Sequence, residues 1–401
     1  MTDTELIFNP FEPGFTDDPY PAYRDLRDAD PVHESPFGLT VVSRYEDVGA
    51  LLRAGLSVDS RLVAPGMYRD QFDRLDIAEP TLSLSMLDRD PPDHTRLRSL
   101  VTKVFTPRSV AALEPMITEL VDDALDRIEE SGRVDLVEAL AFPLPFTVIS
   151  RMLGVPTTDH IRIRALSGTI VRSLEPVADP QVLDEIVEAG IEMAGIIRGL
   201  IAWKRGNPGD DLLSALIAAE QDGDRLTEDE LAAQILLLYV AGHETTVNLI
   251  SNAVVALLRH PDQLALLRDR PDLADNAVEE FLRYDSPVQQ TRRITTAPYT
   301  LGGREIPQGA FVVGCLASAN RDERFWGEDA DRLRIDRPNA RSHVAFGAGP
   351  HHCLGASLAR LEGRVAIERL ARRFPGLAFD GEVTWNGRIN LRGPALLPVA
   401  V

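Results

Sequence analysis

The chain has 401 residues, of which 44% are hydrophobic and 26% are charged, so it is long and apolar enough to bury a large core. Its formal net charge of −20 at pH 7 disfavours nucleic acid and anionic membranes as partners, because binding to either requires clustered cations. Its two cysteines, Cys315 and Cys353, form no C-x-x-C pair, so neither a disulfide framework nor a structural zinc site is supported.

A single domain over residues 1–401 is the simplest organisation, because no Gly/Ser-rich or highly charged linker and no repeat of fixed period interrupts the chain. The start of the chain has no basic segment followed by an apolar run. The longest apolar stretch, residues 235–242, is far too short to span a bilayer. We therefore expect a cytoplasmic protein that does not bind membranes.

Helical periodicity dominates the chain, and β signals are few and short. The apolar spacing predicts helices over residues 20–30, 45–54, 93–104, 108–131, 180–205, 227–258, 261–285 and 355–374. Strand signals fall near residues 31–43, around the Gly302-Gly303 turn, at 310–316 and toward the C-terminus. Long loops are expected near 57–92 and 172–180, either as lids over an organic ligand or as ordinary surface loops. The predicted fold class is mainly α with small β-sheets (α+β).

Two short motifs lie on predicted helices, one early in the chain and one just past its middle. The helix from residue 93 opens after two prolines and places His94 and Arg98 one turn apart on one face. The longest predicted helix contains Ala241-Gly242-His243-Glu244-Thr245-Thr246. Glycine inside a helix costs about 1 kcal/mol of stability relative to alanine, so the presence of Gly242 calls for an explanation. In isolation, Glu244 on a solvated face and Thr245 bonded back to the helix would be ordinary. This helix also lacks the second histidine of a zinc-protease motif.

Two further segments follow. Glu280 and Arg283 have the i,i+3 spacing of a helical ion pair, which alone is worth roughly a few tenths of a kcal/mol. Cys353 follows Gly347 and Gly349, whose backbone freedom lets a loop bend tightly and present N–H groups to one sulfur. A helix N-terminus after Cys353, like metal coordination, would favour its thiolate. Cys315 lies in an apolar strand-like run and is expected to be an inert buried thiol.

The pattern F-G-x-G-x-H-x-C-x-G from Phe346 to Gly355 closely resembles the haem-binding loop of the cytochrome P450 superfamily. The other motifs occur in the order found in that family, so the resemblance covers the chain from about residue 10 to the C-terminus. It implies the cytochrome P450 fold, with haem b (iron protoporphyrin IX) between the long helix and the Cys loop. In the family the cysteine thiolate ligates the haem iron, and Cys353 matches it.

The resemblance also implies roles for other residues. The catalytic acid and alcohol would be Glu244 and Thr245, beside a small residue, Ala241, and a groove for dioxygen at Gly242. The propionates of haem would be bound by His94, Arg98, His351 and Arg293, with Arg292 as the register alternative to Arg293. Phe346, Gly347, Gly355 and Ala241 would contact the cofactor, and Leu237, Val240, Ala241 and Val288 would line the substrate pocket. Glu280 and Arg283, joined by Arg337, would be structural, although Leu333 and a long segment at 325–330 depart from the family pattern near Arg337.

The implied function is a monooxygenase of secondary metabolism that inserts one oxygen atom from O2 into a hydrophobic small molecule, by hydroxylation or epoxidation. The chain has no dinucleotide fingerprint and no cysteine cluster, so electrons would come from another protein. The resemblance implies that this partner is a ferredoxin fed by a ferredoxin reductase, and we also expect a monomer. Arg96, Lys103, Arg360 and Arg364 either steer that acidic partner or are ordinary solvated helix charges. Alternative functions are a peroxide-driven haem-thiolate enzyme, a haem-thiolate sensor without turnover, and a helical scaffold without cofactor.

Overall fold

The computed structural model describes residues 8–78, 81, 84–156, 160–177, 179–218 and 226–401. These residues form two compact units. The first, here called the sheet unit, comprises the chain up to Leu56, Pro115–Pro143 and Thr245–Val401. The second, the helical unit, comprises Ser57–Glu114 and Leu144–Glu244. The expectation of one domain stays a prediction.

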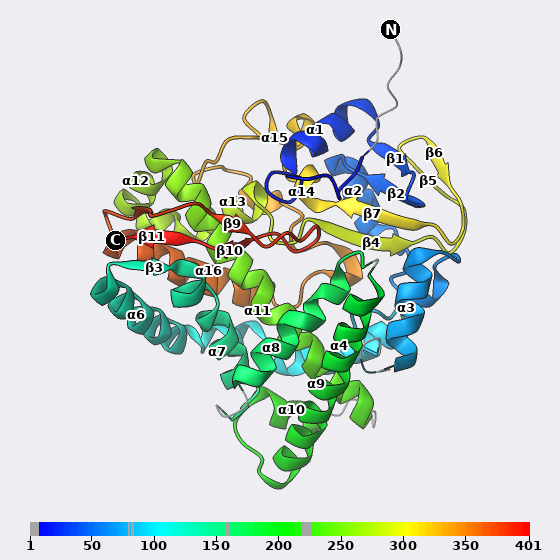
Figure 1. Ribbon diagram of the computed structural model, residues 1–401, viewed down its shortest axis with the longest axis horizontal. Helices are drawn as coiled ribbons and strands as arrows, with labels where there is room; N and C mark the ends of the chain where they lie inside the picture. The colour runs from blue at the N-terminus through cyan, green and yellow to red at the C-terminus, as the bar shows by residue number, and fades with distance from the viewer. Residues whose placement is uncertain (1–7, 79–80, 82–83, 157–159, 178, 219–225) are drawn as a thin grey trace. The chain divides into compact units, whose positions relative to one another are not determined.

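The sheet unit carries the strands β1 to β11 and most of the short helices (Figure 1). Its helices are α1 (Tyr20–Ala29), α2 (Tyr45–Arg53), α6 (Glu114–Ser131), α12 (Pro261–Asp269), α13 (Ala274–Tyr284), α14 (Leu316–Ala319), α15 (Glu323–Trp326) and α16 (Ala356–Arg373), with the π-helical turn Val137–Ala141 and the 3-10 turns Pro271–Leu273, Ala340–Ser342 and Gly349–His351. The long helix α11 (Glu228–Arg259) passes from the helical unit to the sheet unit between Glu244 and Thr245.

Four strands form the main sheet, in the order β1 (Val32–Ser35), β2 (Leu39–Val42), β7 (Phe311–Cys315) and β4 (Gln290–Ile294). β2 pairs with β7 in parallel, and the other pairs are antiparallel. The smaller sheets comprise β5 (Tyr299–Leu301) with β6 (Arg304–Ile306), β3 (Arg133–Asp135) with β11 (Pro398–Ala400) and β8 (Ala378–Phe379), and β9 (Thr384–Trp385) with β10 (Pro394–Leu396). Apolar residues of α2, β2, β7 and α14 pack together against one face of the main sheet, which fixes α2 beside it.

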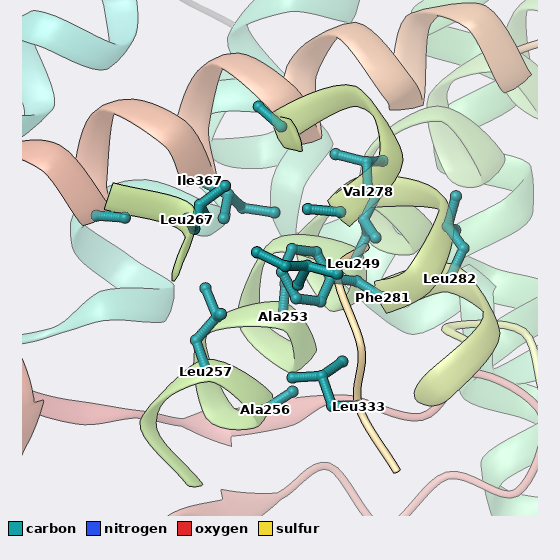
Figure 2. Packing of buried hydrophobic residues seen from close by; sticks show 14 of the residues in the cluster. Leu249, Ala253, Ala256, Leu257, Leu267, Val278, Phe281, Leu282, Leu333 and Ile367 are labelled. Carbon is teal, nitrogen blue, oxygen red and sulfur yellow. The ribbon is translucent and has the colours of Figure 1, made fainter. Parts of the chain in front are cut away.

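The main core of the sheet unit is built by helices far apart in the sequence. Figure 2 shows Phe281 of α13 among leucines and alanines of α11, with Ile367 of α16 and Leu333 from the segment after α15 close by. Gly363 of α16 faces Leu249, and a Cβ at this glycine would lie 3.1 Å from the leucine side chain. Burial of this apolar surface is the main favourable term that holds α11, α13 and α16 together.

A buried ionic cluster joins α13 to the segment that leads to α16. The Glu280 carboxylate accepts two hydrogen bonds from Arg283 (2.7 and 2.8 Å) and two longer ones from Arg337 Nε (3.1 and 3.2 Å), with both Glu280 and Arg283 fully buried. Arg283 also donates to the carbonyls of Asn320 and Ala330 (2.8 Å each). Since buried charges are tolerated only when paired and hydrogen-bonded, this cluster specifies the path of residues 320–337.

The helical unit contains α3 (Met67–Ala78), α4 (Asp93–Val104), α5 (Pro107–Ala111), α7 (Pro143–Met152), α8 (His160–Ile170), α9 (Pro180–Gly206) and α10 (Leu212–Ala218), together with the first half of α11 and the 3-10 turns Ser60–Leu62 and Val171–Leu174. α9 begins with Pro180 after Asp179, whose side chain accepts from Gln181 N (2.9 Å), a common way to start a helix. At its other end the buried Lys204 pairs with Asp211, which joins α9 to the start of α10.

The mainly helical fold class with small sheets is confirmed. Several element boundaries predicted from the sequence are wrong. The supposed loop at 57–92 contains α3, the helix at 108–131 is split into α5 and α6, and that at 261–285 is split at Pro271 into α12 and α13. The sequence interpretation also missed α7, α8, α10, β3 and β4. Leu75 shows why α3 forms: it packs on Val177, Leu183 and Ile186, a contact that local periodicity does not reveal.

In the part of the chain that the structure describes, no helix is both long enough and apolar enough to cross a membrane.

Glu280→Gln tests the buried cluster, because it keeps the side-chain shape but leaves the buried Arg283 guanidinium without its counter-charge and Arg337 with Asp329 alone. We expect the free energy of unfolding, measured with urea, to fall by about 3 to 5 kcal/mol. The matched control is Asp272→Asn, because Asp272 accepts two bonds of similar length (2.7 and 2.8 Å) from Arg270 on the surface. The control should not change the unfolding midpoint, and an equal loss in both variants would contradict the role given to burial.

Candidate functional site

The loop that carries Cys353 follows Arg337, the last residue of the ionic cluster in the sequence, and leads into α16. Val344 N donates to Asn320 Oδ1 (2.8 Å), which holds the start of the loop against the residue that follows α14. Within the loop, Gly347 N donates to Val344 O (2.8 Å) and Cys353 N donates to Phe346 O (2.9 Å). These two bonds close the loop and hold the cysteine backbone against its first residues.

Two glycines give the loop its shape. Gly347 and Gly349 have φ values of +67° and +70°, in the left-handed region that residues with a Cβ rarely adopt. At Gly349 a Cβ would also lie only 2.8 Å from the carbonyl oxygen of Leu52, at the end of α2. Gly355, which precedes α16, lies beside the sulfur, since a Cβ built on it would be 4.0 Å from Cys353 Sγ. The loop therefore fits closely between α2 and α16.

The two cysteines differ in the way that ligand chemistry requires. Cys353 is exposed, whereas Cys315 is fully buried in β7, where burial raises the pKa of its thiol well above the usual value. A thiolate must be accessible and partly stabilised to ligate a metal ion. Of the two cysteines, Cys353 is the accessible one. Its position just before the N-terminus of α16 favours the thiolate, as the sequence predicts.

Glu279, next to Glu280 on α13, holds both ends of the Cys loop. Its carboxylate accepts from His343 Nε2 (3.0 Å), at the start of the loop, and from Arg360 Nε (2.9 Å), in the second turn of α16. Burial alone would raise the pKa of Glu279, but the bonds from His343 and Arg360 hold it below its usual value. Arg360 also lies over the ring of Phe346, with its guanidinium carbon 4.5 Å from the ring centre.

Each unit carries some of the positively charged or hydrogen-donating side chains that the family resemblance assigns to anionic groups of the cofactor. In the sheet unit, Arg293 on β4 is buried and donates to Arg292 O (2.6 Å) and Thr291 Oγ1 (3.1 Å), while Arg292 is half-buried and points to the other face. His351 is half-buried in the 3-10 turn before Cys353. The structure thus favours Arg293 over Arg292 as the buried cation.

In the helical unit, His94 is buried in the first turn of α4 with Arg98 one turn further on. Burial and the charge of Arg98 lower the pKa of His94, and Asp90 opposes this shift. Asp90 in turn accepts from Val58 N (2.9 Å), which fixes the entry to α4. A guanidinium and an imidazole that can donate, one turn apart on one helix face, suit an anionic group better than a neutral one.

α11 is buried along nearly its whole length. From Leu231 to Leu257 all but five residues are buried. The five that keep some exposure are Leu237, Ala241, Gly242, Glu244 and Thr245. Leu237, Ala241, Glu244 and Thr245 share one face by their spacing, which we call the α11 stripe. Packing on α7 does not require Gly242, because a Cβ there would meet Ile149 at an ordinary 3.6 Å.

The structure therefore groups the predicted site residues as follows. In the sheet unit, Phe346, Gly347, His351, Cys353 and Gly355 lie in one loop, Arg293 lies on β4, and Val288 is half-buried and bridges Leu391. In the helical unit, Leu237, Val240, Ala241 and Glu244 lie on α11, and His94 and Arg98 lie on α4. Val240 is buried, so it does not belong to the α11 stripe.

Sequence reasoning missed several buried acids, among them Glu279, described above, and Glu362 of α16. The carboxyl of Glu362 is fully buried, and burial raises its pKa from the usual 4.5 to about 8, an effect that the hydroxyl of Thr246 only partly opposes. Neither carboxyl oxygen has a hydrogen-bond partner within normal range among the described residues. A signal was available: Glu362 lies four residues after Leu358 and four before Ala366, on the buried stripe of α16.

The chain is similar to known proteins over nearly its whole length. A family model described as "Cytochrome P450" matches residues 202–382. The chain is 44% identical to "Cytochrome P450 107B1" of Saccharopolyspora erythraea, over 97% of this chain and 96% of that protein. It is also 44% identical to "Vitamin D(3) 25-hydroxylase" of Pseudonocardia autotrophica, over 98% and 96%. The crystal structure of a myxobacterial cytochrome P450, CYP267B1, in complex with myristic acid superposes with a TM-score of 0.90 at 36% identity, covering 98% of each chain.

Glu362 predicts a pH dependence of stability. Because its pKa is raised in the folded state, the folded protein binds more protons than the unfolded chain between pH 4.5 and about 8, so stability falls as pH rises through this range. The loss from this residue is at most about 4 to 5 kcal/mol. Glu362→Gln should flatten the profile of unfolding free energy against pH. Glu368→Gln, at a half-buried position of the same helix, should keep the slope of the native protein.

Proposed function

Because the chain belongs to the cytochrome P450 family, a family of monooxygenases with a haem-thiolate cofactor, we propose that Cys353 is the thiolate ligand of its haem. We further propose that the enzyme inserts one oxygen atom from O2 into a hydrophobic small molecule. The observation that carries this proposal is the α11 stripe, which presents an acid and an alcohol, Glu244 and Thr245, on an otherwise buried helix. A purely structural helix would gain nothing from this pair.

The residues of the candidate site fit the cofactor. The exposed sulfur of Cys353 follows a loop whose positive-φ glycines let the backbone approach a flat partner closely. The buried guanidinium of Arg293 and the imidazoles of His94 and His351, with Arg98, suit the two propionates of haem b. When bound, a haem with a thiolate ligand supplies the chemistry of dioxygen activation.

The protein's own contribution is to position groups and move protons. The reaction R–H + O2 + 2 e⁻ + 2 H⁺ → R–OH + H2O consumes two protons, which must reach a site that excludes bulk water. Glu244 keeps partial access to solvent and can exchange protons with it, and the adjacent Thr245 hydroxyl can hold a water and pass a proton on. This arrangement favours the use of O2 over a peroxide-driven reaction, which brings its oxygen already reduced.

The substrate is proposed to be a hydrophobic small molecule that undergoes hydroxylation or epoxidation. Leu237 and Ala241 on the α11 stripe are apolar residues with some exposure, as the lining of a pocket for such a molecule needs. Val288 of the sheet unit is apolar and half-buried, and its part in the lining stays a prediction. Two of the relatives support an apolar substrate, because one is named for vitamin D(3) and the other holds myristic acid. A cytoplasmic location is proposed on the sequence grounds given above, and a monomeric state is proposed with it.

A separate protein must deliver electrons, as in the family, and we propose a ferredoxin with its reductase. The basic residues considered for docking are engaged in ion pairs: Arg96 with Glu230, Arg360 with Glu279, and Arg364 with Asp275 (3.4 Å). The side chain of Lys103 lies outside the described residues. These pairings argue against a steering patch at Arg96, Arg360 and Arg364. Arg96 and Arg364 fit ordinary helix charges, whereas Arg360 connects α16 to the buried Glu279.

The ligand assignment predicts the spectrum of two cysteine variants. Cys353→Ser should abolish the red-shifted Soret band that thiolate ligation gives the reduced, carbonylated protein. Cys315→Ser is the matched control and should retain that band, because Cys315 is buried in β7. Retention of the band in Cys353→Ser would overturn the ligand assignment.

The role of Thr245 predicts how electrons are divided between products. Thr245→Ala should lower the fraction of consumed electrons recovered in product by about tenfold and raise hydrogen peroxide release, because proton supply is no longer directed. Thr245→Ser keeps the hydroxyl and should stay close to the native ratio. The check is the product and peroxide formed per NAD(P)H oxidised with the redox partners present, and an unchanged ratio in Thr245→Ala would remove Thr245 from the mechanism.

A further inference from the structure

His243 is a buried imidazole that the proposed function leaves without a role. It precedes Glu244 on α11, and its side chain is 1% exposed. Its ring meets the ring of Phe146 from α7 edge to face, with centroids 5.7 Å apart and an interplanar angle of 90°. Since buried polar groups are normally hydrogen-bonded, the partners of its two nitrogens should show what the ring does.

The first nitrogen is an anchor. His243 Nδ1 lies 2.6 Å from the carbonyl oxygen of Tyr239, one turn earlier on the same helix. A carbonyl oxygen can only accept, so Nδ1 must carry the hydrogen and donate it. This bond fixes the orientation of the ring and makes Nε2 the nitrogen that can gain or lose a proton.

The second nitrogen faces two oxygen atoms. Ser167 Oγ of α8 lies 3.5 Å from Nε2, and Glu244 Oε2 lies 3.9 Å from it. The Ser167 hydroxyl donates to Arg164 O (3.1 Å), so it turns its lone pairs toward the imidazole. A neutral Nε2 would set its own lone pair against those of both oxygens, whereas a protonated Nε2 donates to the serine and attracts the carboxylate. Burial opposes a charge on the ring, whereas the contacts with Ser167 and Glu244 favour it, so these two contacts are what sustains an imidazolium here.

The separation of 3.9 Å makes the contact between His243 and Glu244 an ion pair rather than a hydrogen bond. Such a pair is strengthened where water is excluded, and both side chains are largely shielded here. The titratable or polar groups that contact the ring directly include Ser167 of α8, and Tyr239 and Glu244 of α11. Ser150 of α7 and His160 of α8 lie one contact further out, the first through Tyr239 Oη (3.3 Å) and the second edge to face with Phe146.

We propose that His243 is a positioning residue for Glu244, which as an imidazolium holds the carboxylate in the orientation from which it supplies protons. The proposal rests on the proposed function, because it acts only through Glu244. Tyr239 and Ser167 fix the ring, and Nε2 holds the acid. Loss of the Nε2 proton at higher pH releases the carboxylate, so the fraction of electrons recovered in product falls as pH rises through the pKa of His243.

Two substitutions distinguish the bond from Nδ1 to Tyr239 O from the contact of Nε2 with Glu244. His243→Asn keeps a donor near the position of Nδ1 but has nothing at Nε2, whereas His243→Gln offers a neutral donor near Nε2. With the complete enzyme and its redox partners, His243→Asn should lower product per electron by about tenfold with little change in KM, because misplacing a catalytic group affects the chemical step. His243→Gln should recover part of this loss and lose the pH dependence. Native product per electron in His243→Asn would overturn the proposal.

A second measurement needs no turnover. Nitrogen NMR of the reduced, carbonylated holoprotein labelled with ¹⁵N-histidine reports the protonation of each ring nitrogen, and the His243 signals are those missing from His243→Asn. Glu244→Gln should lower the pKa of His243 by about one unit, because the negative charge that favours the imidazolium is removed. An unchanged titration would overturn the pairing. If no variant, nor the native enzyme, forms product, the proposed function fails, but the titration still decides whether the pair exists.

Discussion

The buried carboxylate of Glu280 is the group on which the order of the sheet unit depends. It accepts from Arg283, from Arg337 and from the backbone N–H of Arg334 (2.9 Å), so its lone pairs are well satisfied. Arg337 in turn donates to Asp329, through both its carboxylate (3.0 Å) and its backbone carbonyl (2.9 Å). An ionic cluster out of water is stable only in the arrangement that satisfies all its members, so the segment after α15 has a single path.

The same helix transmits this order to the candidate haem ligand. Glu279 and Glu280 are neighbours on α13, and each carboxylate serves a different part of the chain. Glu280 holds the segment before the Cys loop, whereas Glu279 holds the first residues of the loop through His343 and the helix after it through Arg360. The loop is thus held at both ends, and its glycines determine only the turn between them. The position of Cys353 therefore depends on the buried ion pairs of Glu279 and Glu280 as well as on the glycines of its own loop.

α11 combines two requirements that usually conflict. Its C-terminal half contributes Leu249, Ala253 and Leu257 to the main core, which favours an entirely apolar helix. Its middle carries polar groups, of which His243 is buried and Glu244 and Thr245 keep some exposure. Polar groups in this setting are costly unless they are paired, and the contacts of His243 with Tyr239, Ser167 and Glu244 offset that cost. The proposed chemistry therefore lies where the helix departs from core packing.

The sequence by itself determined the fold class, most long helices and the Cys loop, because these depend on local properties: apolar periodicity, helix-starting residues and glycines with positive φ. The tertiary structure alone decided that α3 and β4 exist, since contacts with distant segments stabilise them. It also decided that Glu280 and Arg337, 57 residues apart, form a buried pair rather than a surface one, and that Glu362 holds its proton near neutral pH. Burial and the distance between charges set the strength of an ion pair and the pKa of an acid, and both depend on the neighbours that folding brings together.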